Sequence, residues 1–128
     1  YTTLFRSNKT ADDHFLFVYH NCGNTIPLYE TIASIGADVY HFGDAIDLEE
    51  MLKVFTKDKI VMGNISPAKV IRSLTPDKIR ENVLQLLSRC SKYDNFVVST
   101  GCDIPPSTPL ENIDAYFAAV SEFYEGRS

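Results

Sequence analysis

The sequence has no long hydrophobic run and no excess of positive charge. Its longest uncharged apolar stretch, residues 15–19, is far shorter than the roughly 20 residues that span a bilayer. The 12 Lys and Arg residues are outnumbered by 17 Asp and Glu residues, which gives a net charge of −5. A chain of this charge has no basic surface for a phosphate backbone. The sequence therefore predicts neither a membrane span nor a nucleic-acid partner.

Cysteine is also scarce, and a secretory leader is missing. The three cysteines are an odd number and are widely spaced, which disfavours a disulfide framework and favours a reducing compartment, by default the cytoplasm. The first residues, from Tyr1 to Arg6, contain neither an initiating Met nor an apolar leader segment. We therefore expect the chain to be part of a longer coding sequence.

The composition is that of an ordinary globular protein, with 45% hydrophobic and 23% charged residues. The length of 128 residues allows one domain at most. It is about half of the roughly 250 residues that a complete (β/α)₈ barrel takes. We expect residues 1–128 to form a single, partial domain.

One sequence unit occurs four times along the chain. In each unit an apolar, β-branched or aromatic run ends at a Gly-containing turn, and an amphipathic segment follows. Apolar runs without strict alternation are typical of parallel strands that are covered on both faces. The sequence therefore predicts an α/β fold of four parallel βα units, with strands at 15–20, 37–42, 59–62 and 95–100.

Capping signals predict the two longest helices. Thr108 offers a hydroxyl at the N-cap, Pro109 suits the first helical position, and Glu111 would close a capping box, so we expect a helix over 109–124. Thr75 and Pro76 repeat the device before an apolar stripe that ends at Cys90, which places Cys90 in the core. Weaker helices are expected at 25–35 and 48–55, and a short one from Ser66-Pro67.

Three residues that can bind a metal follow the first and last predicted strands. His20 and Cys22 are two positions apart on an extended segment, so their side chains share a face, and Cys102 follows the fourth strand. One imidazole and two thiolates make a tetrahedral zinc site with one open position, as in catalytic zinc centres. Alternatively, His20 is a hydrogen-bonded histidine at a strand end and the cysteines are small buried hydrophobes.

The metal hypothesis sets a condition on the shape of the sheet. In a flat sheet the first and fourth strands would lie about 14 Å apart. Two sulfurs bound to one zinc ion must be within about 4 Å of each other. The sheet must therefore curl, as the strands of a closed barrel do.

Other polar residues lie in the same predicted loops and have weaker cases. Asp44 could fill the fourth metal position or be an exposed turn residue, and Asn64 could bind substrate or stabilise the turn after the third strand. Asp103 could accept a hydrogen bond from His20 or be solvated. His41 lies within a strand, where we expect it to contact a neighbouring side chain.

Three motifs resemble a known family. They are HNCGNT at 20–25, GNISP at 63–67 and GCDIPPSTPLEN at 101–112. They are similar to the carboxyl-terminal half of the uroporphyrinogen decarboxylase superfamily, and more narrowly to its zinc-dependent branch, the methylcobamide:coenzyme M methyltransferases. The resemblance extends from about Phe15 to Tyr124. It implies a (β/α)₈ TIM barrel of which this chain supplies the carboxyl-terminal half, strands five to eight.

The resemblance also separates the two branches of that superfamily. Porphyrinogen decarboxylases have a Gly-His-Gly type of turn where this chain has residues 101–103 (GCD), and they lack the His-x-Cys pair. The methyltransferase branch uses His-x-Cys and a distant Cys as zinc ligands, which match His20, Cys22 and Cys102. From their places in the loops at the strand ends, Asp44 remains a candidate fourth ligand, and Asn64 and Asp103 remain candidate cofactor or substrate contacts.

The function implied is methyl transfer from a methylated corrinoid to a small-molecule thiol that zinc keeps ionised. The expected partners are a corrinoid protein and the thiol. The alternatives are a metal-free decarboxylase acting on tetrapyrroles and a non-catalytic corrinoid-binding relative. Half a barrel leaves two strand edges and an inner face uncovered. We therefore expect the isolated chain to be inactive and either to self-associate as a homo-oligomer, such as a dimer, or to rearrange its sheet.

Overall fold

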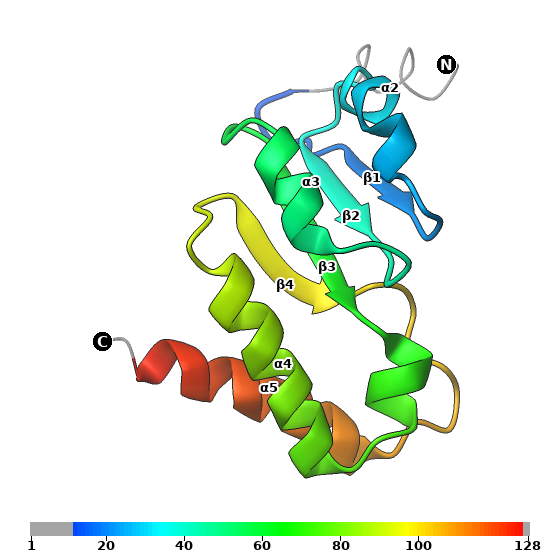
Figure 1. Cartoon of the computed structure of the whole chain (residues 1–128), viewed down its shortest axis with the longest axis vertical. Coiled ribbons are helices and arrows are strands. Elements are labelled where there is room, and N and C mark those ends of the chain that lie inside the picture. The colour runs from blue at the N-terminus through cyan, green and yellow to red at the C-terminus, as the bar shows by residue number, and fades with distance from the viewer. Residues whose placement is uncertain (1–11, 127–128) are drawn as a thin grey trace.

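The structure, a computed structural model, describes residues 12–126 and contains four strands alternating with helices (Figure 1). The strands are β1 (Val18–Asn21), β2 (Val39–Phe42), β3 (Ile60–Ile65) and β4 (Phe96–Thr100). The helical segments are η1 (Ile26–Leu28), α2 (Tyr29–Ala33), α3 (Leu48–Val54), η2 (Pro67–Arg72), α4 (Pro76–Cys90) and α5 (Leu110–Glu125). No helix among the described residues is long and apolar enough to cross a membrane.

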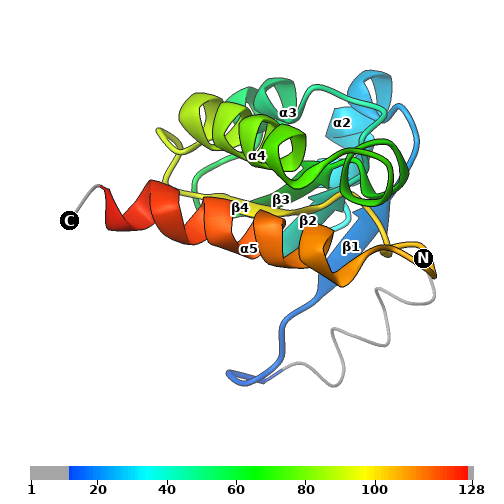
Figure 2. The same cartoon turned by 90° about the horizontal axis from the view of Figure 1, so that it is seen from below.

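The four strands form one parallel sheet in the order β1-β2-β3-β4, as the sequence predicts. Each connection carries helical structure, and α2, α3 and α4 lie along one face of the sheet, with α5 beside β4 and α4 (Figure 2). The predicted arrangement of four parallel βα units is therefore confirmed.

The core lies between the sheet and these helices. Tyr40 and Phe42 of β2 are fully buried on this side, and both rings pack against Phe55, at centroid distances of 4.5 and 5.9 Å. The Tyr40 hydroxyl donates to the carbonyl oxygen of Ala33 and accepts from the amide of Ala37, so its polar atom is satisfied. Cys90 has no exposed surface and belongs to this core, as predicted.

The sequence misplaced several element boundaries. The first strand begins at Val18 instead of residue 15, and the segment expected to be one helix from residue 25 is a short 3₁₀ turn followed by the five residues of α2. The third strand continues through Gly63 and Asn64 to Ile65, where the sequence predicts a turn. Asn64 therefore lies in a strand, and the hypothesis that it stabilises a turn is wrong.

The expected capping box before α5 is also wrong. The N-cap of α5 is Pro109, not Thr108. The Thr108 hydroxyl instead donates to the carbonyl oxygen of Pro105 at 2.7 Å and closes the turn that precedes the helix. Thr75 is the N-cap of α4, as expected, with Pro76 at the first helical position.

The sheet face opposite the helices, called here the open face, is apolar and exposed. Val18, Ile60 and Val97 lie on it with 48%, 36% and 42% of their surfaces accessible. Strand register places the side chains of His20 and His41 on the same face. Uncovered apolar surface favours association, as do the edges of β1 and β4, which have no partner strand among residues 12–126.

We expect the isolated chain to self-associate, because the exposed apolar side chains of the open face can be buried only if this face packs against another protein. Size-exclusion chromatography with light scattering should give a mass above that of one chain. The double variant Val18→Lys/Val97→Lys should lower this mass. Val54→Lys, a change at an equally exposed site on α3, is the matched control and should not. A monodisperse monomer at high concentration would contradict the expectation.

Candidate metal centre

The structure brings together His20, Cys22 and Cys102. His20 is in β1, Cys22 follows that strand, and Cys102 follows β4. The Nε2 atom of His20 lies 2.8 Å from Cys22 Sγ, and Cys22 Sγ lies 3.4 Å from Cys102 Sγ. The three potential ligand atoms all lie within 4.8 Å of one another, the only such group of three or more His, Cys, Asp or Glu residues in the described range 12–126.

The strand ends meet because glycine allows their main chains to touch. A Cβ atom at Gly43 would lie 2.8 Å from the Cα of Cys22, and one at Gly101 would lie 2.9 Å from the Asp44 amide nitrogen. Both distances are too short for real side-chain carbons. Gly43 and Gly101 therefore permit the ends of β1, β2 and β4 to converge, whereas a flat sheet would keep β1 and β4 about 14 Å apart.

The donor set fits a zinc ion. Two sulfurs at about 2.3 Å from one tetrahedral ion are separated by about 3.8 Å, and an imidazole nitrogen and a sulfur by about 3.5 Å. The two sulfurs of Cys22 and Cys102 are 3.4 Å apart, and His20 Nε2 is 2.8 Å from Cys22 Sγ, so both separations are shorter than in a zinc-bound site. Thiolate and imidazole are ligands that zinc prefers over the hard oxygen ligands of magnesium and calcium. Small movements of three side chains at the ends of strands would complete the site.

The main chain orients His20 for such a role. Its Nδ1 atom lies 3.2 Å from the carbonyl oxygen of His41. A carbonyl can only accept a hydrogen bond, so in the neutral imidazole Nδ1 carries the proton and Nε2 keeps its lone pair. That lone pair faces Cys22. A backbone carbonyl behind a histidine is a common support for a metal ligand.

Without a cation, the site favours protonated Cys22. The hydrogen bond with Cys102 raises the pKa of the Cys22 thiol, and the negative charges of Cys102, Asp44 and Asp103 add to the effect. A divalent cation would reverse this preference because its charge stabilises the thiolate form.

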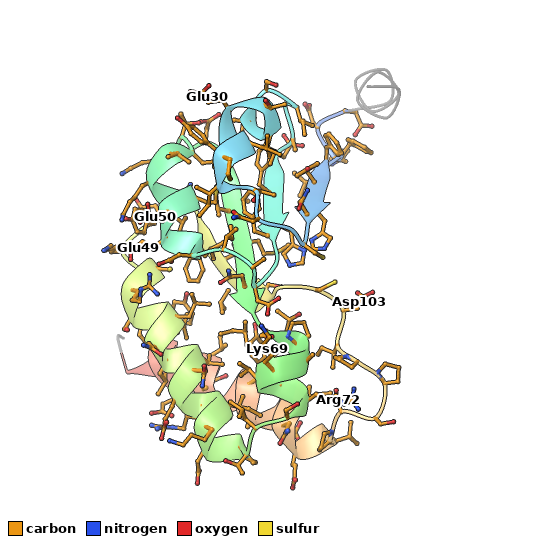
Figure 3. All side chains as sticks on the ribbon, turned by 45° about the vertical axis from the view of Figure 1, so that its right-hand side comes forward. Glu30, Glu49, Glu50, Lys69, Arg72 and Asp103 are labelled. Carbon is orange, nitrogen blue, oxygen red and sulfur yellow. The ribbon has the colours of Figure 1, made fainter. Side chains whose placement is uncertain are left out.

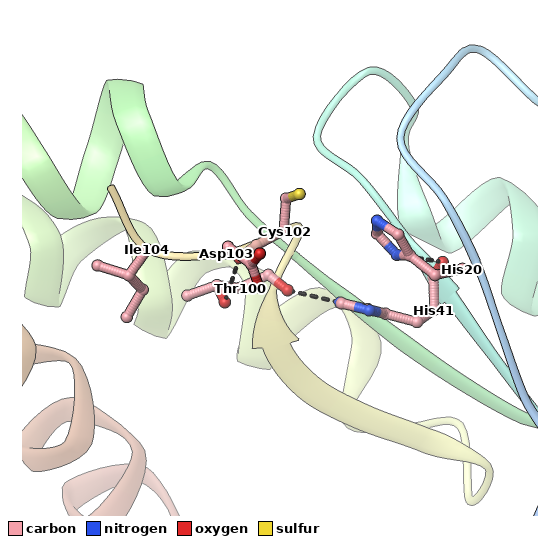
Figure 4. A pocket seen from close by; sticks show the side chains of 6 residues that line it. All are labelled: His20, His41, Thr100, Cys102, Asp103 and Ile104. Carbon is pink, nitrogen blue, oxygen red and sulfur yellow. Dashed lines mark hydrogen bonds between the residues drawn. The ribbon is translucent and has the colours of Figure 1, made fainter. Parts of the chain in front are cut away.

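A cavity of about 520 Å³ opens beside the three residues (Figure 4). Its lining consists of His20, His41, Thr100, Cys102, Asp103 and Ile104. This volume is within the range of small-molecule sites, which are usually 300–1,000 Å³. A small ligand could therefore reach the cysteine sulfur from the open face of the sheet.

The structure does not bring Asp44, Asn64 or Asp103 into this group of three. Asp44 lines a second cavity, of about 340 Å³, which also contains Asn64 and Lys69. Lys69 lies on η2, whereas Asp103 lies on the loop after β4 (Figure 3). The amide of Asn64 donates to the carbonyl oxygens of Gly43 and Ile46, at 3.1 and 2.8 Å, and so holds the loop between β2 and α3.

His41 is the residue whose contribution sequence reasoning missed. The acceptor behind His20 is the main-chain oxygen of His41, where the sequence suggested the carboxylate of Asp103. The ring of His41 also lies 4.5 Å from that of His20. The available signal was its strand position, because parallel register pairs His20 with His41.

Mild oxidation of the reduced, metal-free chain should join Cys22 to Cys102. The sulfurs are 3.4 Å apart, and both belong to residues with exposed surface. Burial raises the pKa of Cys90 to about 11, so its thiol should not react. We expect diamide to remove two of the three titratable thiols and to leave Cys90, with the linkage seen by non-reducing peptide mapping. Three remaining thiols, or a linkage between chains only, would contradict the geometry.

Comparisons with known proteins agree with this fold. The model of the family "Uroporphyrinogen decarboxylase (URO-D)" matches residues 2–123. A methyltransferase structure from Methanosarcina mazei covers 96% of this chain with a TM-score of 0.80 and 28% identity, and the match takes up 35% of that protein. The likeness confirms the predicted half of a (β/α)₈ barrel.

Curated relatives include both branches of the family. A methylcobamide:CoM methyltransferase of Methanosarcina barkeri is 33% identical over 116 residues, 90% of this chain and 33% of the relative. A methylated-thiol–coenzyme M methyltransferase of M. mazei is 28% identical over 105 residues, 82% of this chain and 27% of the relative. A uroporphyrinogen decarboxylase of Chlamydia caviae is 30% identical over 92 residues, 72% of this chain and 26% of the relative.

The chain thus spans about a third or less of the lengths of these relatives. The family match nevertheless covers nearly all of the chain, and its relatives are methyltransferases or decarboxylases. The chain therefore belongs to the uroporphyrinogen decarboxylase (URO-D) family.

Proposed function

We propose that this chain carries the metal centre of a corrinoid-dependent methyltransferase that transfers a methyl group to a small-molecule thiol, giving a methyl thioether. The observation that carries the proposal is the convergence of one imidazole and two thiols at the mouth of the half barrel. The names of two relatives, which act on coenzyme M, support this branch of the family.

His20, Cys22 and Cys102 would hold zinc, and Asp44 is the candidate for a fourth ligand in the absence of a thiol. When bound, zinc would lower the pKa of a substrate thiol so that the thiol is ionised at neutral pH. His20 is held in the required tautomer by the carbonyl of His41. Asp103 lines the cavity of 520 Å³ and is a candidate substrate contact.

Asn64 supports the site from the neighbouring strand. Both of its amide hydrogen bonds go to the loop that carries Asp44, so it would fix that loop near the site, and its side-chain oxygen is a candidate ligand contact. In a reducing compartment such as the cytoplasm, Cys22 and Cys102 would stay available as thiols.

The rest of the reaction requires groups beyond this chain. We propose that residues 1–128 are a partial domain and that a complete barrel would be needed to cover the open face. A corrinoid protein would deliver the methyl group and a small-molecule thiol would receive it. On this view the isolated chain binds metal and thiol but does not turn over.

Metal analysis of the chain under reducing conditions tests the proposal. We expect about one zinc per chain. In the cobalt-substituted protein, adding 2-mercaptoethanesulfonate should change the sulfur-to-cobalt charge-transfer absorption, whereas ethanesulfonate, which lacks the thiol, should not. A reduced chain that binds no zinc would contradict the proposal and favour the decarboxylase branch, to which other relatives belong.

A further inference from the structure

His41 makes a side-chain contact that spans the sheet. It is in β2, and its Nε2 atom lies 2.7 Å from the carbonyl oxygen of Thr100, the last residue of β4. Because β3 lies between these two strands, the imidazole of His41 reaches across a strand on the open face. The carbonyl of Thr100 can only accept, so Nε2 of His41 is the donor.

The other contacts of His41 lead to the opposite side of the metal centre. Its main-chain oxygen accepts from Nδ1 of His20 at 3.2 Å, and its ring is tilted by 38° to that of His20 at a centroid distance of 4.5 Å (Figure 4). One residue therefore contacts the histidine ligand with its main chain and its ring, and the end of β4 with its Nε2 atom.

The contact with Thr100 continues to Cys102. The Thr100 hydroxyl donates to the carbonyl oxygen of Cys102 at 2.9 Å. The position of Cys102 is thus linked to β2 through Thr100, while His20 is paired with β2 directly and Cys22 follows the last paired residue of β1. His41 spans the gap between the two parts of the donor set.

We propose that His41 is a positioning residue of the metal centre, whose Nε2–H···O=C bond to Thr100 sets the location of Cys102 relative to His20 and Cys22. The proposal rests on the metal-binding part of the proposed function. It requires no direct contact between His41 and the ion.

Two substitutions separate this role from simple packing. His41→Phe keeps an aromatic ring but removes the donor, whereas His41→Gln keeps an N–H donor at a similar distance from the main chain. The main-chain carbonyl that faces His20 remains in both. Loss of an outer hydrogen-bond partner typically costs 10- to 100-fold in metal affinity.

We expect His41→Phe to lower zinc affinity by about 10- to 100-fold in a chelator competition and to shift the absorption of the cobalt-substituted chain. His41→Gln should restore both within a few-fold. Unchanged affinity and absorption in His41→Phe would overturn the proposal. So would equal losses of affinity in the two variants, because a purely structural role would not discriminate between them.

A measurement on the metal-free chain distinguishes failure of the proposed zinc-dependent function from failure of the positioning role of His41. The rate at which diamide joins Cys22 to Cys102 should fall in His41→Phe and be retained in His41→Gln. If the wild-type chain binds no zinc but shows this pattern, the proposed function fails, and what stands is that His41 positions Cys102 relative to Cys22. If the rates are equal in all three proteins, the positioning role fails regardless of metal binding.

Discussion

Replacing Cys102 with Ala is expected to reduce zinc binding from about one ion per chain to none retained through gel filtration under reducing conditions. The change removes one of the two sulfurs and leaves only the neighbouring pair His20 and Cys22. The loss of a direct ligand should exceed the roughly 10- to 100-fold cost of losing an outer partner. Inductively coupled plasma mass spectrometry on the purified variant provides the measurement.

Cys90→Ala is the matched control for this experiment. Cys90 is completely buried in the core beneath the sheet, so its replacement should lower the free energy of unfolding and leave the zinc content unchanged. Cys102 is partly exposed in a loop, so its replacement should remove the zinc and leave the free energy of unfolding of the metal-free chain nearly unchanged. Zinc that remains bound after Cys102→Ala would indicate adventitious surface sites and refute the assigned ligand set.

Gly101→Ala is expected to weaken metal binding by more than tenfold without altering any ligand. The added Cβ would lie 2.9 Å from the Asp44 amide nitrogen and 3.1 Å from the Cα of Gly43. These are main-chain atoms, so the overlap can be relieved only by moving the end of β4 away from β2, and Cys102 moves with it. Overpacking of this kind also costs about 1–3 kcal/mol of stability.

Gly126→Ala provides the comparison, because a Cβ there would lie 3.4 Å from the nearest atom, the carbonyl oxygen of Glu122, at the end of α5. Its zinc affinity, measured by competition with a chromophoric chelator, and its urea denaturation midpoint should match those of the wild type. If Gly101→Ala binds zinc as tightly as the wild type, the close approach of β2 and β4 is not what assembles the site.

The elements that sequence reasoning predicted correctly are those with local signals. An apolar run identifies each strand, although the glycine after the third run lies within β3, and the apolar stripe ending at Cys90 identifies α4. The extension of β3 to Ile65 has no such signal, because it depends on pairing of Asn64 with Ser99 and of Ile65 with Thr100. The hydroxyl of Thr108 could cap the helix by accepting from a main-chain amide of its first turn, but it instead donates to the carbonyl oxygen of Pro105 and closes the preceding turn.

The same distinction applies to the metal centre. Residue type and spacing made His20, Cys22 and Cys102 candidates but left a structural role open, and the resemblance to the methyltransferase branch favoured the metal site. The need for a curled sheet followed from the length of a zinc–sulfur bond. The support from His41 depends on strand register and on a contact across β3. Neither is encoded in the spacing of residues along the chain, so the sequence offered only Asp103, as one of two alternatives, for the acceptor of a hydrogen bond from His20.

The separation of the two sulfur ligands along the chain has a consequence for protein abundance. An ion shared by Cys22 and Cys102 would join positions 80 residues apart, which come together only when the chain is folded. Such an ion stabilises the folded state alone, by about 2.7 kcal/mol when the free metal is at 100 times its dissociation constant, against a typical domain stability of roughly 5–15 kcal/mol. If the proposed site binds zinc, cells starved of the metal would therefore contain less of this polypeptide, because more of it would be unfolded and open to proteolysis.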